Sequence, residues 1–257
     1  MKSNRIEAMA EYIDSRMVVS MEELCQHFGM SINTIRRDVA QLQKMGKINK
    51  VYGGVQAARG GELVSFHARR TQNEREKMVV GQLAAQYVKD GDAIFIDSGT
   101  TTREMVRHLA GKQNLVILTH SLSVLNEAYT LPSATVIVLP GMLDRDTGSF
   151  TGPNTTRELR RYNITSAFMA ASGYSLTNQV TNSSVQEFEI KQAAVEHSKR
   201  SILLLDHSKF GKNGLLTYAQ IHAFSSVIVD KEPEAKYMDA IQRAGVQLLT
   251  PDTIENP

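Results

Sequence analysis

From about residue 90 onward, short apolar runs alternate with segments of helical periodicity, and this alternation limits the possible folds more than any other property of the chain. Six runs are predicted strands: AIFID (93–97), LVILT (115–119), TVIVL (135–139), SAFMAA (166–171), SILLLD (201–206) and SVIVD (226–230). Helices are predicted between them, near 102–110, 121–129, 153–162, 186–198 and 233–244. Short strands of branched residues separated by helices are typical of an α/β domain with a mainly parallel sheet.

The composition excludes several other classes of protein. Apolar residues make up 42% and charged residues 22% of the 257 residues, as in ordinary globular domains. The longest unbroken apolar run, residues 167–171, is too short to cross a membrane. Cys25 is the only cysteine, which excludes internal disulfides and cysteine-rich zinc sites. The histidines have no metal-binding spacing and no dinucleotide or Walker A motif occurs, so we expect neither a metal nor a cofactor.

The charged residues are unevenly distributed, although the net charge of the chain is only +2. Residues 31–59 contain six Lys and Arg against Asp38 alone, whereas residues 1–30 carry a net charge of −2 and the rest of the chain a net charge of −1. A basic cluster beside a nearly neutral body indicates a small nucleic-acid-binding module on a carrier domain. The alternative is that these charges form the solvated face of a helix. The periodicity of the same segment distinguishes the two interpretations.

The first sixty residues have the pattern of a winged helix-turn-helix. Apolar residues at helical spacing predict a helix over 4–15. Ser20-Met-Glu-Glu23 is a capping box that opens a short second helix, which ends at Gly29. Ser31 caps a third helix, whose buried face is predicted to hold Ile35, Val39, Leu42 and Met45. The segment KINKVYGGVQ follows as a basic two-stranded wing.

The exposed face of the third helix carries side chains that suit the major groove of DNA. Guanidinium groups bind phosphates or guanine edges, and short hydroxyls and amides bind phosphates or adenine. The DNA-binding residues predicted on this helix are Ser31, Asn33, Thr34, Arg36 and Arg37, and those on the wing are Lys47, Lys50 and Tyr52. Asp38 is expected to orient one of the two arginines rather than to approach DNA.

The spacing of these residues matches a known signature. Arg5, Met9 and Ile13, followed after seventeen residues by Ser31 and the run TIRRDV (34–39), resemble the N-terminal signature of the DeoR family of bacterial transcriptional regulators. Tyr52-Gly53-Gly54 resembles the pair of glycines usual in the wing of that family. The resemblance implies a sequence-specific DNA-binding regulator. The alternative for this segment is a helical bundle without a role in DNA binding.

A change in composition separates this module from the α/β segment. Residues 56–75 are polar, contain paired glycines and have no sustained periodicity, so a hinge is predicted near Gly60-Gly61. A new helical pattern starts at Glu76. The predicted organisation is a winged helix-turn-helix DNA-binding domain over 1–57, a linker over 58–75, an α/β effector-binding sensor domain over 76–250 and a C-terminal tail over 251–257.

Polar and small residues follow the predicted strands, at the edge of a parallel sheet where ligands bind. The run DSGTTT (97–102) ends the first strand and leads into a helix, and its glycine, hydroxyls and helix N-terminus favour a phosphate. An ordinary helix cap is the alternative for this run. Further candidates after the other strands are His120, Ser121, Gly141, Gly173, Asp206 and Lys209, and we expect them to line one pocket with Asp97.

The second half of the chain also resembles the DeoR family, in its C-terminal sensor domain, so the resemblance covers roughly residues 4–250. The matching motifs are Glu76-Lys77, DSGTT (97–101), GSF (148–150) with Gly152-Pro153, and DHSKFG (206–211). The resemblance implies a fold similar to that of sugar-phosphate isomerases and coenzyme A transferases, with a phosphorylated sugar as the inducer. By position, it implies that Ser98, Gly99, Thr100 and Thr101 hold the phosphate and that Lys77, Asp206 and Lys209 tune the response.

Three positions depart from the family pattern. His120 stands where Asn is usual, Pro140 where Gly is usual, and Ser172 where an acidic residue is usual. All three lie at predicted strand ends, so we expect them to alter which sugar is recognised rather than the fold.

The predicted function is that of a repressor of a carbohydrate-metabolism operon, released from operator DNA by a phosphorylated sugar or sugar derivative. We expect a homo-oligomer, a dimer or tetramer, that presents two recognition helices to successive half-sites. No membrane partner is expected, and the predicted location is the cytoplasm, with association to the nucleoid on DNA binding. The alternative is a sugar-phosphate isomerase with a regulatory N-terminal module. The acidic residue missing at Ser172 disfavours it, because an isomerase needs a general base.

Overall fold

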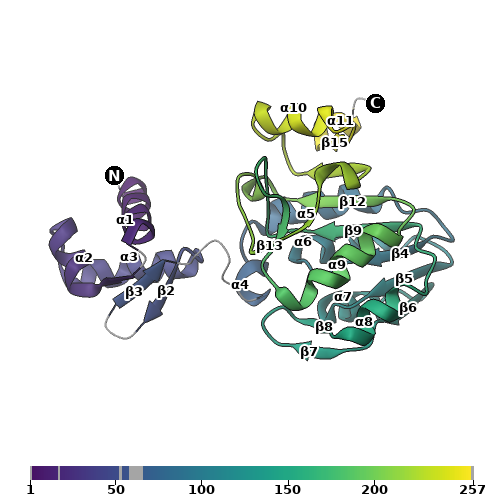
Figure 1. Cartoon of the computed structure of the whole chain (residues 1–257), viewed down its shortest axis with the longest axis horizontal. Helices are drawn as coiled ribbons and strands as arrows, with labels where there is room; N and C mark the ends of the chain where they lie inside the picture. The colour runs from purple at the N-terminus through teal and green to yellow at the C-terminus, as the bar shows by residue number, and fades with distance from the viewer. Residues whose placement is uncertain (1, 17, 52–53, 58–65, 256–257) are drawn as a thin grey trace. The chain divides into compact units, whose positions relative to one another are not determined.

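The computed structural model describes residues 2–16, 18–51, 54–57 and 66–255. The chain divides into two compact units, Met1–Val64 and Ser65–Pro257, each with its own hydrophobic core. Figure 1 shows the helices and strands of both units.

The N-terminal unit consists of three helices and a small antiparallel sheet. The helices are α1 (Lys2–Arg16), α2 (Met21–Phe28) and α3 (Ile32–Lys44), and the strands β1 (Val18–Ser20), β3 (Gly54–Ala57) and β2 (Ile48–Val51) pair in that order. Ser20 Oγ accepts a hydrogen bond from the Glu23 N–H at 3.0 Å, and Gly29 ends α2 with a left-handed φ of 62°. The predicted winged helix-turn-helix is confirmed, and β1 is an additional strand that the sequence pattern did not predict.

The second unit is built on a seven-stranded parallel sheet in the order β15-β14-β12-β9-β4-β5-β6. These strands are β4 (Ala93–Ile96), β5 (Leu115–Thr119), β6 (Ala134–Val138), β9 (Ser166–Ala170), β12 (Ser201–Leu205), β14 (Ser226–Val229) and β15 (Gln247–Leu249). Six of them are the predicted strands, with ends that differ by one residue at most. The predicted mainly parallel α/β architecture is confirmed, and among the described strands of this sheet only the three-residue β15 was not predicted.

Helices cover both faces of this sheet. Successive side chains of a strand point to opposite faces, and apolar side chains on both faces pack against helices. Ile94 and Ile96 of β4 belong to the cluster formed with α5 (Glu74–Ala85) and α7 (Leu122–Ala128). Phe95, between them, belongs to the cluster formed with α8 (Pro153–Leu159), α9 (Val185–His197) and α10 (Ala235–Arg243). The second unit is therefore a three-layer α/β/α structure.

The remaining elements surround this framework. They are the helices α4 (Phe66–Arg70), α6 (Thr100–Arg103) and α11 (Pro251–Glu255), the short turns η1 (Val106–Leu109), η2 (His207–Lys209) and η3 (Ile221–Ala223), the hairpin of β7 (Met142–Asp144) and β8 (Ser149–Thr151), and the antiparallel strands β10 (Gly173–Ser175), β11 (Gln179–Asn182) and β13 (Leu216–Ala219). No helix in the described part of the chain is long and apolar enough to cross a membrane.

Two segments differ from the predicted organisation. Residues 66–75, assigned to the linker from the sequence, belong to the second unit: they form α4 and the start of α5, and the Phe66 N–H donates to the Asp146 carbonyl at 2.8 Å. The polar sequence of α4, FHARR, has no apolar periodicity that would have predicted a helix. The predicted tail is helical over Pro251–Glu255 as α11. Residues 58–65 of the predicted linker lie outside the described residues.

Candidate functional site

Helix α3 presents the predicted polar face to solvent. Ser31 is its N-cap, with Oγ 3.4 Å from the Thr34 N–H and 3.0 Å from the Thr34 hydroxyl, so both hydroxyls are engaged at the start of the helix. Asn33, Arg36 and Arg37 are exposed. Neither arginine makes an ion pair or hydrogen bond with any residue that the structure describes. Two guanidinium groups on the outer face of α3 are therefore available to a partner.

Asp38 has a different role from the predicted one. Arg5 of α1 donates to it from Nε at 2.8 Å and from Nη2 at 3.1 Å, so Asp38 pairs with α1 and not with Arg36 or Arg37. The reason is periodicity: Asp38 lies three residues after the buried Ile35 and is itself on the buried side of α3. The ion pair holds α3 against α1.

The wing is only partly described. Lys47 is exposed and directly precedes β2, and Lys50 lies on β2 opposite Val55 of β3. The side chain of Lys50 and the whole of Tyr52 lie outside what the structure describes. The role of the wing in DNA binding therefore stays a prediction.

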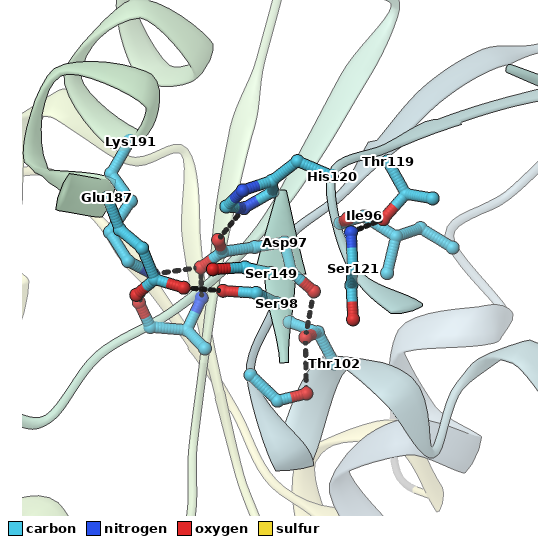
Figure 2. A network of polar contacts seen from close by, with 12 residues as sticks. Ile96, Asp97, Ser98, Thr102, Thr119, His120, Ser121, Ser149, Glu187 and Lys191 are labelled. Atoms are coloured by element: carbon cyan, nitrogen blue, oxygen red, sulfur yellow. Dashed lines mark hydrogen bonds and ion pairs between the residues drawn. The ribbon is translucent and has the colours of Figure 1, made fainter. Parts of the chain in front are cut away.

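Two of the predicted candidates in the second unit, Ser98 and His120, belong to a network around Asp97, which directly follows β4 and is fully buried. Figure 2 shows its network: Asp97 accepts hydrogen bonds from the Ala170 N–H at 2.9 Å and from Lys191 of α9, and Oδ1 lies 3.2 Å from Nε2 of His120. Burial alone would raise the pKa of Asp97, but Lys191 and His120 outweigh burial and hold that pKa well below its usual range. Asp97 is thus a permanently charged residue that fixes the end of β4.

Two charged residues of this network, Glu187 and Lys191, were not predicted. Both lie on α9 and are buried, and Glu187 accepts a hydrogen bond from the Ser98 hydroxyl at 2.5 Å (Figure 2). Their spacing of four residues places them on one face of the helix. The sequence contained one signal for this pair: two opposite charges lie on the same face of α9 as the apolar residues Ile190 and Ala194.

Gly99 and the threonines after it form a tight loop. A Cβ added to Gly99 would lie 2.2 Å from Cβ of Ala170, so glycine is required by packing against β9. The Thr102 hydroxyl donates to the carbonyls of Asp97 at 2.7 Å and Gly99 at 3.0 Å, which closes the loop. The hydroxyls of Thr100 and Thr101 make no hydrogen bond to any described residue, and these are the two that remain for a ligand.

Three further candidates have structural roles. Ser121 is the N-cap of α7, and its Oγ accepts a hydrogen bond from the Val124 N–H at 3.3 Å. A Cβ at Gly141 would lie 2.7 Å from the Thr151 nitrogen, and one at Gly173 would lie 2.2 Å from the Lys212 carbonyl oxygen. Neighbouring backbone fills the space beside both glycines, so packing requires them, and their place in an effector pocket stays a prediction.

Lys77, Asp206 and Lys209 form a second polar group with Arg69 of α4. The buried Lys77 donates from Nζ to the carbonyl oxygens of Arg69 and Gln72. Burial lowers the pKa of Lys77 to about 8, with smaller contributions from Lys209 and Arg69, although Asp206 opposes the shift. The four charged side chains thus act on one another across α4, α5 and the loop after β12.

The comparisons with known proteins agree with this geometry. The model of the DeoR-like helix-turn-helix domain matches residues 5–59, and that of the DeoR C-terminal sensor domain matches residues 72–231. The HTH-type transcriptional regulator IolR of Bacillus subtilis is 42% identical over 237 residues, which cover 92% of this chain and 94% of that protein. The glycerol-3-phosphate regulon repressor of Escherichia coli is 27% identical over 247 residues, 96% of this chain and 98% of that protein.

Among solved structures, ribose 5-phosphate isomerase A from Methanocaldococcus jannaschii aligns with a TM-score of 0.41 at 18% identity, over 54% of this chain and 55% of that chain. The family models together match both units, and the resemblance found in the sequence is confirmed. The chain belongs to the DeoR family and is a DNA-binding transcriptional regulator with a C-terminal sensor domain.

Proposed function

We propose that this protein is a repressor of a carbohydrate-metabolism operon and that a phosphorylated sugar binds its second unit and releases it from operator DNA. The relative from Escherichia coli is named as the repressor of a glycerol-3-phosphate regulon, and another from Bacillus subtilis, GlcR, is named as a repressor. The observation that carries the proposal is the loop after β4, at the carboxyl edge of the sheet, where the buried hydroxyls of Thr100 and Thr101 make no hydrogen bond to any described residue.

Operator binding is assigned to the outer face of α3. Arg36 and Arg37 suit phosphates or guanine edges and Asn33 suits adenine, while Lys47, Lys50 and Tyr52 of the wing suit the flanking backbone. Ser31 and Thr34 start the helix, where backbone N–H groups favour a phosphate. Two such helices are needed for two half-sites, so we propose a homo-oligomer, a dimer or tetramer.

Effector binding is assigned to the carboxyl edge of the parallel sheet. Ser98, Gly99, Thr100 and Thr101 supply backbone and hydroxyl donors to a phosphate, while Asp97, His120 and Lys191 keep that loop in place. Lys77, Asp206 and Lys209 lie in the charged group on the neighbouring elements. Ser121, Gly141 and Gly173 shape the surrounding loops.

The geometry favours regulation over isomerisation. A general base needs a carboxylate or imidazole whose proton affinity is matched to the reaction. Asp97 is neutralised by Lys191 and has a depressed pKa, which makes it a weak base. The imidazole of His207 is engaged by Asp230, with Nδ1 2.8 Å from Oδ2. We therefore propose that the bound sugar phosphate is a signal and is not converted.

The test is a screen of sugar phosphates against the full chain by thermal shift and by fluorescence anisotropy on operator DNA. One compound should raise the melting temperature and release the operator, and Thr100→Val, which removes a hydroxyl, should need a higher concentration for both effects. Thr177→Val is the matched control, because Thr177 is exposed in the turn between β10 and β11 and is not among the residues proposed to bind the effector. Release by no phosphorylated sugar, or turnover of the bound one, would refute the proposal.

A further inference from the structure

Helix α3 begins with a large apolar side chain that the N-terminal unit leaves exposed. Ile32 is the first residue of α3 and is 39% exposed, whereas Ile35, Val39 and Leu42 of the same helix are buried in the core of this unit. Among the described residues, Ile32 belongs neither to that core nor to the partly buried residues that pack against it. The alkyl surface of Ile32 is therefore left to solvent or to a partner.

The neighbours of Ile32 on the surface of α3 are polar groups that suit base edges. Successive residues of an α-helix are about 100° apart, so Arg36 lies one turn after Ile32 on the same side and Asn33 lies beside it. Both neighbours are exposed. The first residues of a recognition helix are those that contact base edges in the major groove. Ile32 thus adds an apolar group to a guanidinium and an amide at the end of α3 where base contacts are expected.

The start of α3 holds Ile32 in a defined conformation. Ser31 caps the helix, with Oγ 3.4 Å from the Thr34 N–H and 3.0 Å from the Thr34 hydroxyl. A β-branched side chain in a helix has one strongly preferred rotamer. Ile32 therefore presents a fixed shape, and little side-chain entropy is lost when a partner covers it.

The same face of α3 allows a close approach to DNA. Ala40 is exposed one turn after Arg36, so a methyl group lies among the longer polar side chains of this face. A small residue at this position leaves room for the helix to enter the groove. The first turn of α3, with Ile32, can then reach the base edges.

The chemistry of the major groove leaves one favourable partner for an alkyl side chain. Base edges there present hydrogen-bond donors and acceptors, and the C5-methyl group of thymine is the apolar exception. An isoleucine against guanine or adenine would displace water from an acceptor without replacing its hydrogen bond. Contact with a thymine methyl group instead removes two apolar surfaces from water. An exposed isoleucine on this face therefore favours thymine.

We propose that Ile32 contacts the C5-methyl group of one thymine in each operator half-site and is a specificity-determining residue of the DNA-binding unit. Asn33 and Arg36 read neighbouring base pairs by hydrogen bonds, so the first turn of α3 combines apolar and polar recognition. This inference rests on the assignment of operator binding to α3, which is part of the proposed function, and does not depend on the effector.

The test compares thymine with uracil, which keeps the hydrogen-bonding groups of thymine and lacks its methyl group. Duplexes that bind the full chain are selected from a library with a randomised centre, and each thymine of a selected half-site is replaced in turn by deoxyuridine. Affinity is measured by fluorescence anisotropy. For the wild type, one such replacement should weaken binding about fourfold, as expected for one buried methyl group, and the same replacement in both half-sites about fifteenfold.

Ile32→Ala removes the branched side chain and places a strong helix former at an exposed position, so the helix is retained. It should bind the thymine and uracil duplexes equally, and both at least as weakly as the wild type binds the uracil duplex. Ile32→Gln, carried through the same selection, should enrich adenine in place of thymine at that position and leave the flanking positions unchanged.

Met45→Ala is the matched control. Met45 is the other large apolar residue that the described part of the N-terminal unit exposes, at 44%, although the sequence predicted it on the buried face of the helix. It lies at the C-cap of α3, at the opposite end from Ile32. Met45→Ala should keep the affinity of the wild type and its preference for thymine over uracil.

Two results would overturn the inference: no thymine whose replacement by deoxyuridine weakens binding of the wild type, or the same loss on replacement in Ile32→Ala as in the wild type. Loss of the preference for thymine in Met45→Ala would overturn it as well, because the effect would then not depend on the start of α3. Failure of every sugar phosphate to release the wild type from the selected duplex would refute the proposed effector and leave the thymine contact standing.

Discussion

Replacing Asp38 by asparagine should destabilise the N-terminal unit by about 2–3 kcal/mol. The Asp38 side chain is 2% exposed and accepts two hydrogen bonds from Arg5, whose side chain is 26% exposed. Removing one partner of a fully buried pair costs about 3–5 kcal/mol, and water reaching Arg5 reduces that cost. An amide in place of the carboxylate keeps one acceptor and points its NH₂ group at the guanidinium.

Hydrogen exchange measured by mass spectrometry is the appropriate assay, because it reports each unit of the full chain separately. Protection of amides in α1 and α3 should fall by about 30- to 150-fold, while protection in the sheet of the second unit stays unchanged. Glu22→Gln, at an exposed position of the same unit, is the control for the loss of one negative charge. The double variant with Arg5→Gln gives the coupling energy of the pair. Equal protection in Asp38→Asn and Glu22→Gln would show that this ion pair does not hold α3 against α1.

Four further outcomes are expected. Gly99→Ala should lower the free energy of unfolding of the second unit by about 1–3 kcal/mol in urea titrations, because its Cβ would collide with Ala170. Arg36→Ala should weaken operator binding by about 1–3 kcal/mol and reduce discrimination among variant operators, measured by anisotropy. Lys47→Ala should weaken binding to all sequences alike and reduce the slope of log K against log salt by about one. Effector affinity in calorimetry should fall as the pH rises through about 8, because the pKa of Lys77 lies there and an anion binds its charged form.

The elements that could be predicted from the sequence are those specified by local patterns. Ser20 and Ser31 cap α2 and α3 as their spacing predicted, because a cap depends on residues within one helical turn. The six longer strands were found from runs of branched residues. The elements that were missed are short: β1 and β15 have three residues each and α4 has five, for example, and none of these is long enough to show a period.

The candidate site was predicted only as far as it is local. Asp97 and its loop are visible as a motif, whereas Lys191 lies 94 residues further along the chain and reaches Asp97 through the packing of α9 on the sheet. The same holds for Asp38. Its partner Arg5 lies 33 residues earlier, whereas the sequence predicted a partner on the same helix, Arg36 or Arg37. Hydrogen bonds between distant residues follow from the fold and cannot be found from spacing.

Net charge explains why one binding surface was evident from the sequence and the other was not. The cations at residues 31–59 lie close together in the chain, and Arg36, Arg37, Lys44 and Lys47 are exposed, so their sum predicts an electrostatic surface. In the second unit, Arg69, Lys77 and Lys209 are separated by up to 140 residues and their segment sums to nearly zero. Folding brings them together with the carboxylates of Asp206, Asp97 and Glu187, an arrangement that no segment total contains. An effector shifts a regulator between two conformations only by the difference in its affinity for them, so the side chains that such a site recruits from distant segments decide the response and no segment total predicts it.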